Sequence, residues 1–187
     1  MERQCSDSTC RPELQHIWHP ASLTWRLRGS TLGTSTCTRR MKMAKLTITR
    51  GLPASGKSTW AEAQRLADPT NTRVVTLDDI RAAIGSSFEQ GDEPLAQGIR
   101  DYTIRKYLEK GYHVISADTN LPERVVGHLR KLAVQAETAE VGIPVEIKDF
   151  RDVPLETCLE RNNDRHARGD FKVPNEAIVS MYERFIK

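Results

Sequence analysis

The chain has 187 residues, of which 38% are apolar and 28% charged, with four cysteines and a formal net charge of +3. This length suits one domain with a real core, and the composition excludes collagen-like and disordered classes. No apolar run approaches the roughly 18 residues of a transmembrane helix, and the sparse cysteines exclude a disulfide-stapled scaffold. We therefore expect a cytoplasmic protein with no membrane partner.

Residues 1–43 differ in composition from the rest of the chain. They hold seven Lys and Arg against three Asp and Glu, and they show neither a helical nor a strand period. We expect a disordered leader, and Met41 and Met43, directly before the first predicted strand, would suit an upstream extension of the true start. A transit peptide is the alternative, because the segment is rich in Arg, Ser and Thr and poor in acids.

The predicted domain covers residues 44–187, where short apolar runs alternate with helical segments that begin at Pro or end at Gly. Strands are predicted at 46–49, 73–77, 112–117 and 144–150, and helices at 59–67, 78–84, 94–110, 123–141, 155–162 and 175–185. This alternation predicts an α/β fold, a three-layer sandwich with a mostly parallel sheet and helices on both faces. The domain has a net charge of −1, which disfavours a large basic face for coating long nucleic acid.

A glycine-rich segment, GLPASGKST at 51–59, follows the first predicted strand and precedes a predicted helix. It matches G-x-x-x-x-G-K-[ST] in the strand–turn–helix context that this motif requires. Gly51 and Gly56 allow a tight turn whose N–H groups point at a phosphate, Lys57 adds a charge for the β- and γ-phosphates, and Ser58 offers a hydroxyl to Mg²⁺. We predict that ATP and Mg²⁺ bind here, through Gly51, Ser55, Gly56, Lys57, Ser58 and Thr59.

The segment LDDIR at 77–81 leaves the second predicted strand, and in open α/β sheets the chemistry gathers at the carboxyl ends of strands. Asp78 could accept a proton from an attacking hydroxyl there. Arg81, one helical turn on, could bind an acceptor phosphate. From position alone, a helix cap and a solvated arginine explain the two residues equally well.

Two further polar segments follow secondary-structure elements. The third predicted strand ends in Asp118-Thr119-Asn120, which suits either a site carboxylate or an ordinary polar turn. Arg161, at the end of the predicted helix 155–162, and Arg165, after it, lie in a segment of low apolar content. That segment suits a mobile lid over nucleotide phosphates or a solvated helix end.

Five segments together resemble the phage T4-type polynucleotide kinase family, in its 5′-hydroxyl kinase domain: GLPASGKSTW (51–60), LDDIR (77–81), SADTNLPERV (116–125), VPLETCLERNNDR (153–165) and VPNEAIVSMYERF (173–185). The resemblance runs from about residue 46 to the C-terminus. It implies a P-loop kinase-like fold that transfers the γ-phosphate of ATP to 5′-hydroxyl ends of DNA or RNA in nucleic-acid end repair. A phage-encoded member would act in the host cytosol.

The resemblance also implies a role for each matched residue. Asp78 would be the general base, Arg81 would bind the phosphate beside the 5′-hydroxyl nucleotide, and Ser58 would hold Mg²⁺. The implied catalytic residues are Lys57, Asp78 and Arg165, the implied substrate-binding residues Arg81, Asp118, Thr119 and Asn120, and the implied lid residues Arg161 and Arg165.

The chain departs from this family at its end. The T4-type enzyme carries a 3′-phosphatase domain with a D-x-D signature after its kinase domain, whereas this sequence shows no such signature and stops at Lys187. We therefore expect any phosphatase or ligase partner on a separate chain. Some members of the family assemble into tetramers, so a homo-oligomer stays open.

Two other functions compete with the polynucleotide kinase. One is a P-loop kinase with a small-molecule or nucleotide-sugar acceptor, as in zeta-toxin-like proteins, and the other is a nucleotide-binding module without phosphotransfer. The TNLPER segment and Arg81 favour a polynucleotide acceptor, and Asp78 argues against a pure switch, which needs no base. DNA and RNA both stay open, because a 2′-hydroxyl contact leaves no short motif.

Overall fold

The computed structural model describes residues 44–86, 91–136, 142–167 and 173–187, so the predicted leader at 1–43 lies outside the described residues. These residues belong to one compact unit of the chain, Arg39–Lys187. Their strands are all parallel and form one sheet in the order β2-β3-β1-β4. The strands are β1 (Lys45–Arg50), β2 (Thr72–Val75), β3 (His113–Ser116) and β4 (Val145–Asp149).

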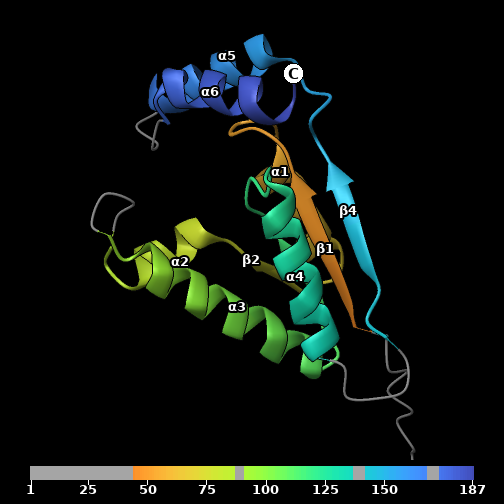
Figure 1. Ribbon diagram of the computed structural model, residues 1–187. Coiled ribbons are helices and arrows are strands. Elements are labelled where there is room, and N and C mark those ends of the chain that lie inside the picture. The colour runs from red at the N-terminus through yellow and green to blue at the C-terminus, as the bar shows by residue number, and fades with distance from the viewer. Residues whose placement is uncertain (1–43, 87–90, 137–141, 168–172) are drawn as a thin grey trace, which may run out of the picture. The chain divides into compact units, whose positions relative to one another are not determined.

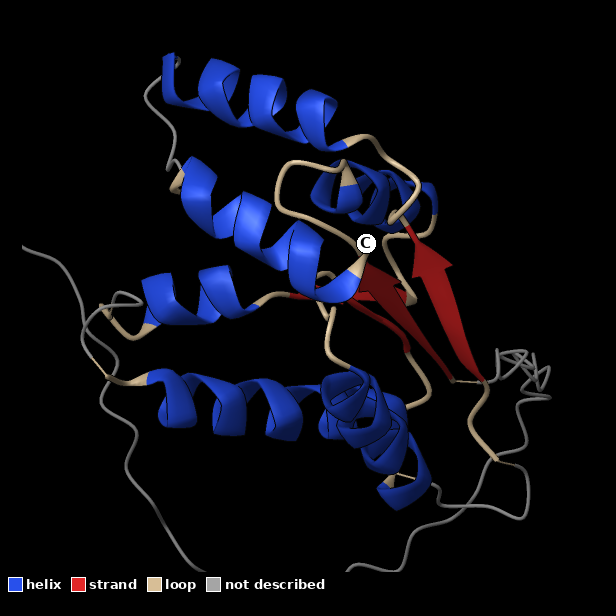
Figure 2. Ribbon diagram, turned by 45° about the horizontal axis from the view of Figure 1, so that its top comes forward, coloured by secondary structure: helices blue, strands red, loops and turns tan. Residues whose placement is uncertain are grey.

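The helices alternate with these strands and lie on both sides of them (Figure 2). They are α1 (Lys57–Ala67), α2 (Leu77–Ala83), α3 (Glu93–Glu109), α4 (Glu123–Gln135), α5 (Leu155–Ala167) and α6 (Asn175–Phe185). The predicted parallel α/β architecture is therefore confirmed. Within the part of the chain that the structure describes, no helix combines the length and apolarity needed to cross a bilayer.

The core explains why the sheet is covered on both faces. Leu46, Ile48 and Val114 pack with the apolar side chains of α3 and α4. Ile115, the neighbour of Val114 in β3, packs instead with Ala61 of α1. Successive strand residues point to opposite faces, so the apolar runs of β1 and β3 require a helix layer on each side.

The last two helices lie beyond the carboxyl ends of β1 and β4 (Figure 1). Cys158 of α5 and Ile178 of α6 are fully buried with Leu52 and Leu121, which follow β1 and β3. This second core fixes α5 above the edge of the sheet where the glycine-rich segment 51–59 lies.

Several element ends differ from those predicted. The α5 helix was predicted to end at residue 162 but runs to Ala167, so Arg165 as well as Arg161 projects from the helix and not from a segment after it. The α4 helix ends at Gln135 although the prediction ran to 141, and residues 137–141 lie outside the described part of the chain. The α1 helix begins at Lys57, two residues early, which places Lys57 and Ser58 in its first turn.

Candidate nucleotide-binding and acceptor site

The loop between β1 and α1 has the backbone geometry of a phosphate cradle. Gly51 has no room for a side chain, because a Cβ there would lie 2.8 Å from the Cβ of Phe150. Ala54 and Gly56 both have positive φ angles, 61° and 97°. The loop thus turns tightly and leads directly into α1, whose N-terminal N–H groups and positive dipole end favour an anion.

Lys57 is the first residue of α1, and its side chain is buried against this loop. Its Nζ donates hydrogen bonds to the carbonyl of Leu52 (2.5 Å) and to Oγ of Ser55 (3.3 Å). Burial lowers the pKa of Lys57 to about 8, while the Cys158 thiol and the Asp118 carboxyl partly oppose the shift. Both acceptors are uncharged oxygens, so the arrangement favours an anion beside this ammonium group.

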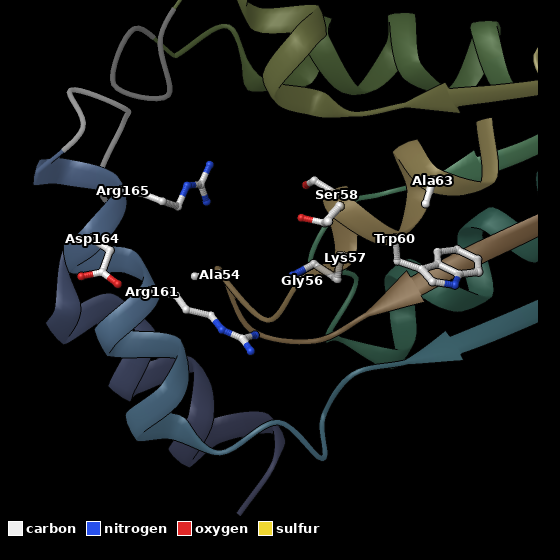
Figure 3. Close-up of a pocket in the computed structure, with 10 residues that line it drawn as sticks. Ala54, Gly56, Lys57, Ser58, Trp60, Ala63, Arg161, Asp164 and Arg165 are labelled. Carbon is white, nitrogen blue, oxygen red and sulfur yellow. The ribbon is translucent and has the colours of Figure 1, made fainter. Parts of the chain in front are cut away.

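A cavity of about 700 Å³ opens over the loop and the first turns of α1 (Figure 3). Arg161 and Arg165 reach toward it from α5, and a Cβ built on Gly56 would lie 4.0 Å from Nη1 of Arg161. The lining carries three cationic groups and one carboxylate, which suits phosphate groups. It consists of Ala54, Gly56, Lys57, Ser58, Thr59, Trp60, Ala63, Arg161, Asp164 and Arg165.

Ser58 and Thr59 are exposed in the first turn of α1, where they line the cavity. Because the Ser58 hydroxyl opens toward the place that phosphates would occupy, it fits as a ligand of Mg²⁺ shared with a nucleotide. The residues of the cradle therefore fit both ATP and its metal ion.

The acceptor-side residues lie on α2, directly after β2. Oγ1 of Thr76 accepts a hydrogen bond from the backbone N–H of Asp79 (3.0 Å) and so caps the helix. Asp78 projects into solvent from the first turn, with its side chain 92% exposed, and Nη1 of Arg81 donates to its Oδ1 (2.6 Å). The second partner of Arg81 is Glu93 at the start of α3, which accepts from Nε and Nη2 at 2.8–3.0 Å.

Asp118 holds the beginning of α2 in place. Its Oδ1 accepts a hydrogen bond from the backbone N–H of Leu77 (2.8 Å), and its Oδ2 lies 3.9 Å from the buried guanidinium of Arg100. Burial raises the pKa of Asp118, and the Leu77 hydrogen bond and Arg100 oppose this. Arg100 is itself paired with Asp101 of α3 (2.8 Å). The end of β3 is thereby tied to α2 and α3 together.

The two residues after Asp118 connect β3 to the cradle. The carbonyl of Thr119 accepts a hydrogen bond from the N–H of Gly51 (3.0 Å). Asn120 adopts a positive φ of 43° and is buried, and its Nδ2 donates to the carbonyl of Thr49 (3.0 Å). The Asn120 side chain thus contacts the backbone of the neighbouring strand.

The structure brings the predicted nucleotide and acceptor residues to one edge of the sheet. The charges of Asp118, Arg165 and Asp78 all act on the pKa of Lys57, so these three groups lie near the cradle. Sequence reasoning missed Glu93 and Arg100. A glutamate such as Glu93 is ordinary in the first turn of a helix, and no short spacing rule links it to Arg81, which lies 12 residues earlier on another helix.

Comparisons with known proteins agree with this fold. A family model described as an AAA domain matches residues 46–187. The chain is 33% identical over 145 residues to the L-seryl-tRNA(Sec) kinase of Methanococcus maripaludis, covering 75% of this chain and 52% of the relative. It thus spans about half the length of that curated relative.

Two solved structures share the fold. One is a chain of the Pnkp1/Rnl/Hen1 RNA repair complex, with a TM-score of 0.64 and 22% identity over 76% of this chain and 44% of that chain. The other is the Mycobacterium tuberculosis APS kinase CysC in complex with AMPPNP and APS, with a TM-score of 0.52 and 20% identity over 67% and 72%. The chain belongs to the AAA domain family, and residues 46–187 form its P-loop kinase-like α/β domain.

Proposed function

We propose that this protein is an ATP-dependent kinase that phosphorylates 5′-hydroxyl ends of DNA or RNA. The observation that carries the proposal is the pairing of Asp78 with Arg81 on α2, on the same edge of the sheet as the phosphate cradle. A carboxylate can take the proton of an acceptor hydroxyl, and a guanidinium beside it can bind a phosphate close to that hydroxyl. The resemblance to T4-type polynucleotide kinase supports the same roles.

The reaction follows from these positions. The 5′-hydroxyl oxygen forms a bond to the γ-phosphorus, the bond from phosphorus to the β–γ bridging oxygen breaks, and ADP leaves with that electron pair. Asp78 takes the hydroxyl proton. Lys57, Arg161 and Arg165 neutralise negative charge on the transferring group. When bound, Mg²⁺ supplies further positive charge to the phosphates, with Ser58 as a protein ligand.

A second candidate acceptor is a hydroxyl carried on aminoacyl-tRNA. The observation that favours it is the 33% identity to an L-seryl-tRNA(Sec) kinase. Such an acceptor also presents a hydroxyl close to nucleic-acid phosphates, so Asp78 and Arg81 would serve it with the same chemistry.

A role in end repair is part of the proposal. The fold shared with a chain of an RNA repair complex supports this role. We accordingly propose a separate phosphatase or ligase chain as a partner, and a homo-oligomer is compatible with the same role.

A panel of acceptors tests the proposal. The protein is incubated with γ-labelled ATP, Mg²⁺ and a 5′-hydroxyl oligonucleotide of either sugar, beside seryl-tRNA, a nucleoside 5′-phosphate and a sugar. The matched controls are the same oligonucleotides carrying a 5′-phosphate. We expect label on the 5′-hydroxyl oligonucleotides alone, and none with Lys57→Ala. Label on seryl-tRNA or a small molecule, with none on either oligonucleotide, would reject the polynucleotide acceptor.

A further inference from the structure

Arg81 is held between two carboxylates in unequal ways. Glu93 contacts it at three points, Nε to Oε2 (3.0 Å), Nη2 to Oε1 (3.0 Å) and Nη2 to Oε2 (2.8 Å). Asp78 contacts it at one point, Nη1 to Oδ1 (2.6 Å). The Glu93 side chain is 26% exposed and comes from α3, whereas the Asp78 side chain is 92% exposed.

These differences decide which contact yields to an incoming anion. A single contact to a solvated carboxylate contributes little, because water and salt compete for it. A bidentate contact to a partly buried carboxylate is stronger and geometrically fixed. A phosphate that approaches Arg81 therefore displaces Asp78 at Nη1 and leaves the Glu93 pair intact.

We propose that the phosphate of the acceptor frees Asp78 by taking its place on Arg81, while Glu93 keeps Arg81 in position. The inference rests on the proposed function, which gives Asp78 and Arg81 their roles. It adds Glu93 as a positioning residue. It also means that Asp78 is fully active as a base only when Arg81 has bound the acceptor phosphate.

The mechanism disfavours acceptors that carry no phosphate. With a bare nucleoside, or with water, the Oδ1 of Asp78 stays partly engaged by Arg81. Transfer to water forms the bond between the water oxygen and the γ-phosphorus, releases ADP with the bridging oxygen, and places the proton on Asp78 to give inorganic phosphate. Both reactions should be slowed by the same ion pair.

Arg81→Ala should therefore have effects of opposite sign. With a nucleoside 3′-phosphate as acceptor, kcat/KM should fall at least tenfold, because a charged contact to the acceptor is lost. With a bare nucleoside, and for ATP hydrolysis without acceptor, kcat should rise two- to fivefold, the range expected for releasing an exposed ion pair. Adding Asp78→Asn to Arg81→Ala should abolish that rise.

Glu93→Gln tests the anchor. Arg81 should then lose its fixed position, so kcat on the nucleoside 3′-phosphate should fall three- to tenfold with a smaller change in KM. The matched control is Glu62→Gln, which breaks the two-point contact of Glu62 with Arg65 on α1, outside the cavity lining. We expect the wild-type kcat for Glu62→Gln.

The outcomes distinguish the release of Asp78 by the acceptor phosphate from the proposed 5′-hydroxyl kinase function. A lowered or unchanged rate of Arg81→Ala on the bare nucleoside and in ATP hydrolysis would overturn the release of Asp78, and so would an unchanged kcat for Glu93→Gln. Because Arg81→Ala strands the Glu93 carboxylate, the double variant Arg81→Ala/Glu93→Gln repeats the test with the charge balanced. If no 5′-hydroxyl acceptor is labelled, the proposed acceptor fails, yet a rise in acceptor-free hydrolysis would still support the Arg81–Asp78 restraint.

Discussion

Lys57 connects the burial of one side chain to the binding of nucleotide. Its ammonium group is enclosed by the loop that should receive the phosphates, and burial lowers its pKa to about 8. Bound phosphates stabilise the charged form and raise that pKa again. Nucleotide binding above pH 8 should therefore take up a proton, whereas below pH 8 the lysine is charged in both states.

This linkage gives a pH dependence of known sign. The affinity for a non-hydrolysable ATP analogue should be level from about pH 7 to 8 and then fall by up to tenfold per pH unit. Titration calorimetry in buffers of different ionisation enthalpy measures both the affinity and the proton uptake. Lys57→Arg keeps its charge throughout this range and serves as the control. A wild-type affinity that is constant to about pH 9.5 would contradict the account.

Residues of the site differ in how far the sequence alone identifies them. Gly51, Gly56 and Lys57 belong to one contiguous motif whose physics is local, so their positions could be predicted. Glu93 could not, because its contact with Arg81 depends on how α2 and α3 pack. Asp118 was identified as a candidate, but its hydrogen bond to the N–H of Leu77 depends on the neighbouring strands β2 and β3.

At the scale of elements, Asn162 is the residue that fixes α5. Its side chain is fully buried, donates to the carbonyl of Val173 (2.7 Å) and to Oδ1 of Asn175 (3.0 Å), and accepts from the N–H of Val173 (3.2 Å). These bonds join the middle of α5 to the start of α6. They also hold the helix that carries Arg161 and Arg165.

Asn162→Ala should therefore destabilise the fold. Removal of the amide leaves the partly buried N–H and carbonyl of Val173 without their partner, and the free energy of unfolding should fall by about 2–4 kcal/mol. Asn163→Ala is the matched control, because the exposed Asn163 makes one long bond to Asn175 (3.4 Å) and should cost no more than about 0.5 kcal/mol. Urea denaturation measures the free energy of unfolding of both variants. If the two variants lose equally little free energy of unfolding, Asn162 does not fix α5.

The same residue explains why α5 was predicted too short. Residues 163–167 carry few apolar side chains, so hydropathy periodicity ends the helix at residue 162. The helix continues because of polar contacts to residues 11 and 13 positions away, which no local pattern records. The strands and the parallel sheet could be predicted from alternation alone. Their order, β2-β3-β1-β4, could not, because it depends on which crossovers pack together.

At the scale of the whole molecule, the charge distribution limits how nucleic acid can bind. Residues 44–187 have a net charge of −1, and the seven Lys and Arg of residues 1–43 lie outside the described part of the chain. An enzyme that contacts only the terminus of a strand needs few phosphate contacts. Binding of nucleic acid to this domain should therefore depend only weakly on salt concentration.

The logarithm of kcat/KM for a 5′-hydroxyl oligonucleotide, at saturating ATP, should fall with the logarithm of salt concentration with a slope of about −1.5, as for two phosphate contacts. Arg81→Ala should flatten this slope by about 0.7. A slope steeper than about −4 would instead require an extended basic surface.

The role of Asp78 as the base is tested by the single-turnover rate of Asp78→Asn with a 5′-hydroxyl oligonucleotide and ATP. Asn keeps the shape of the side chain but cannot take the proton, so the rate should fall by about 10²–10⁴, with the affinity for ATP nearly unchanged. Asp79→Asn, a neighbouring exposed carboxylate on the same helix, should retain the wild-type rate. A rate for Asp78→Asn within about threefold of wild type would contradict the assignment of Asp78 as the base that activates the 5′-hydroxyl.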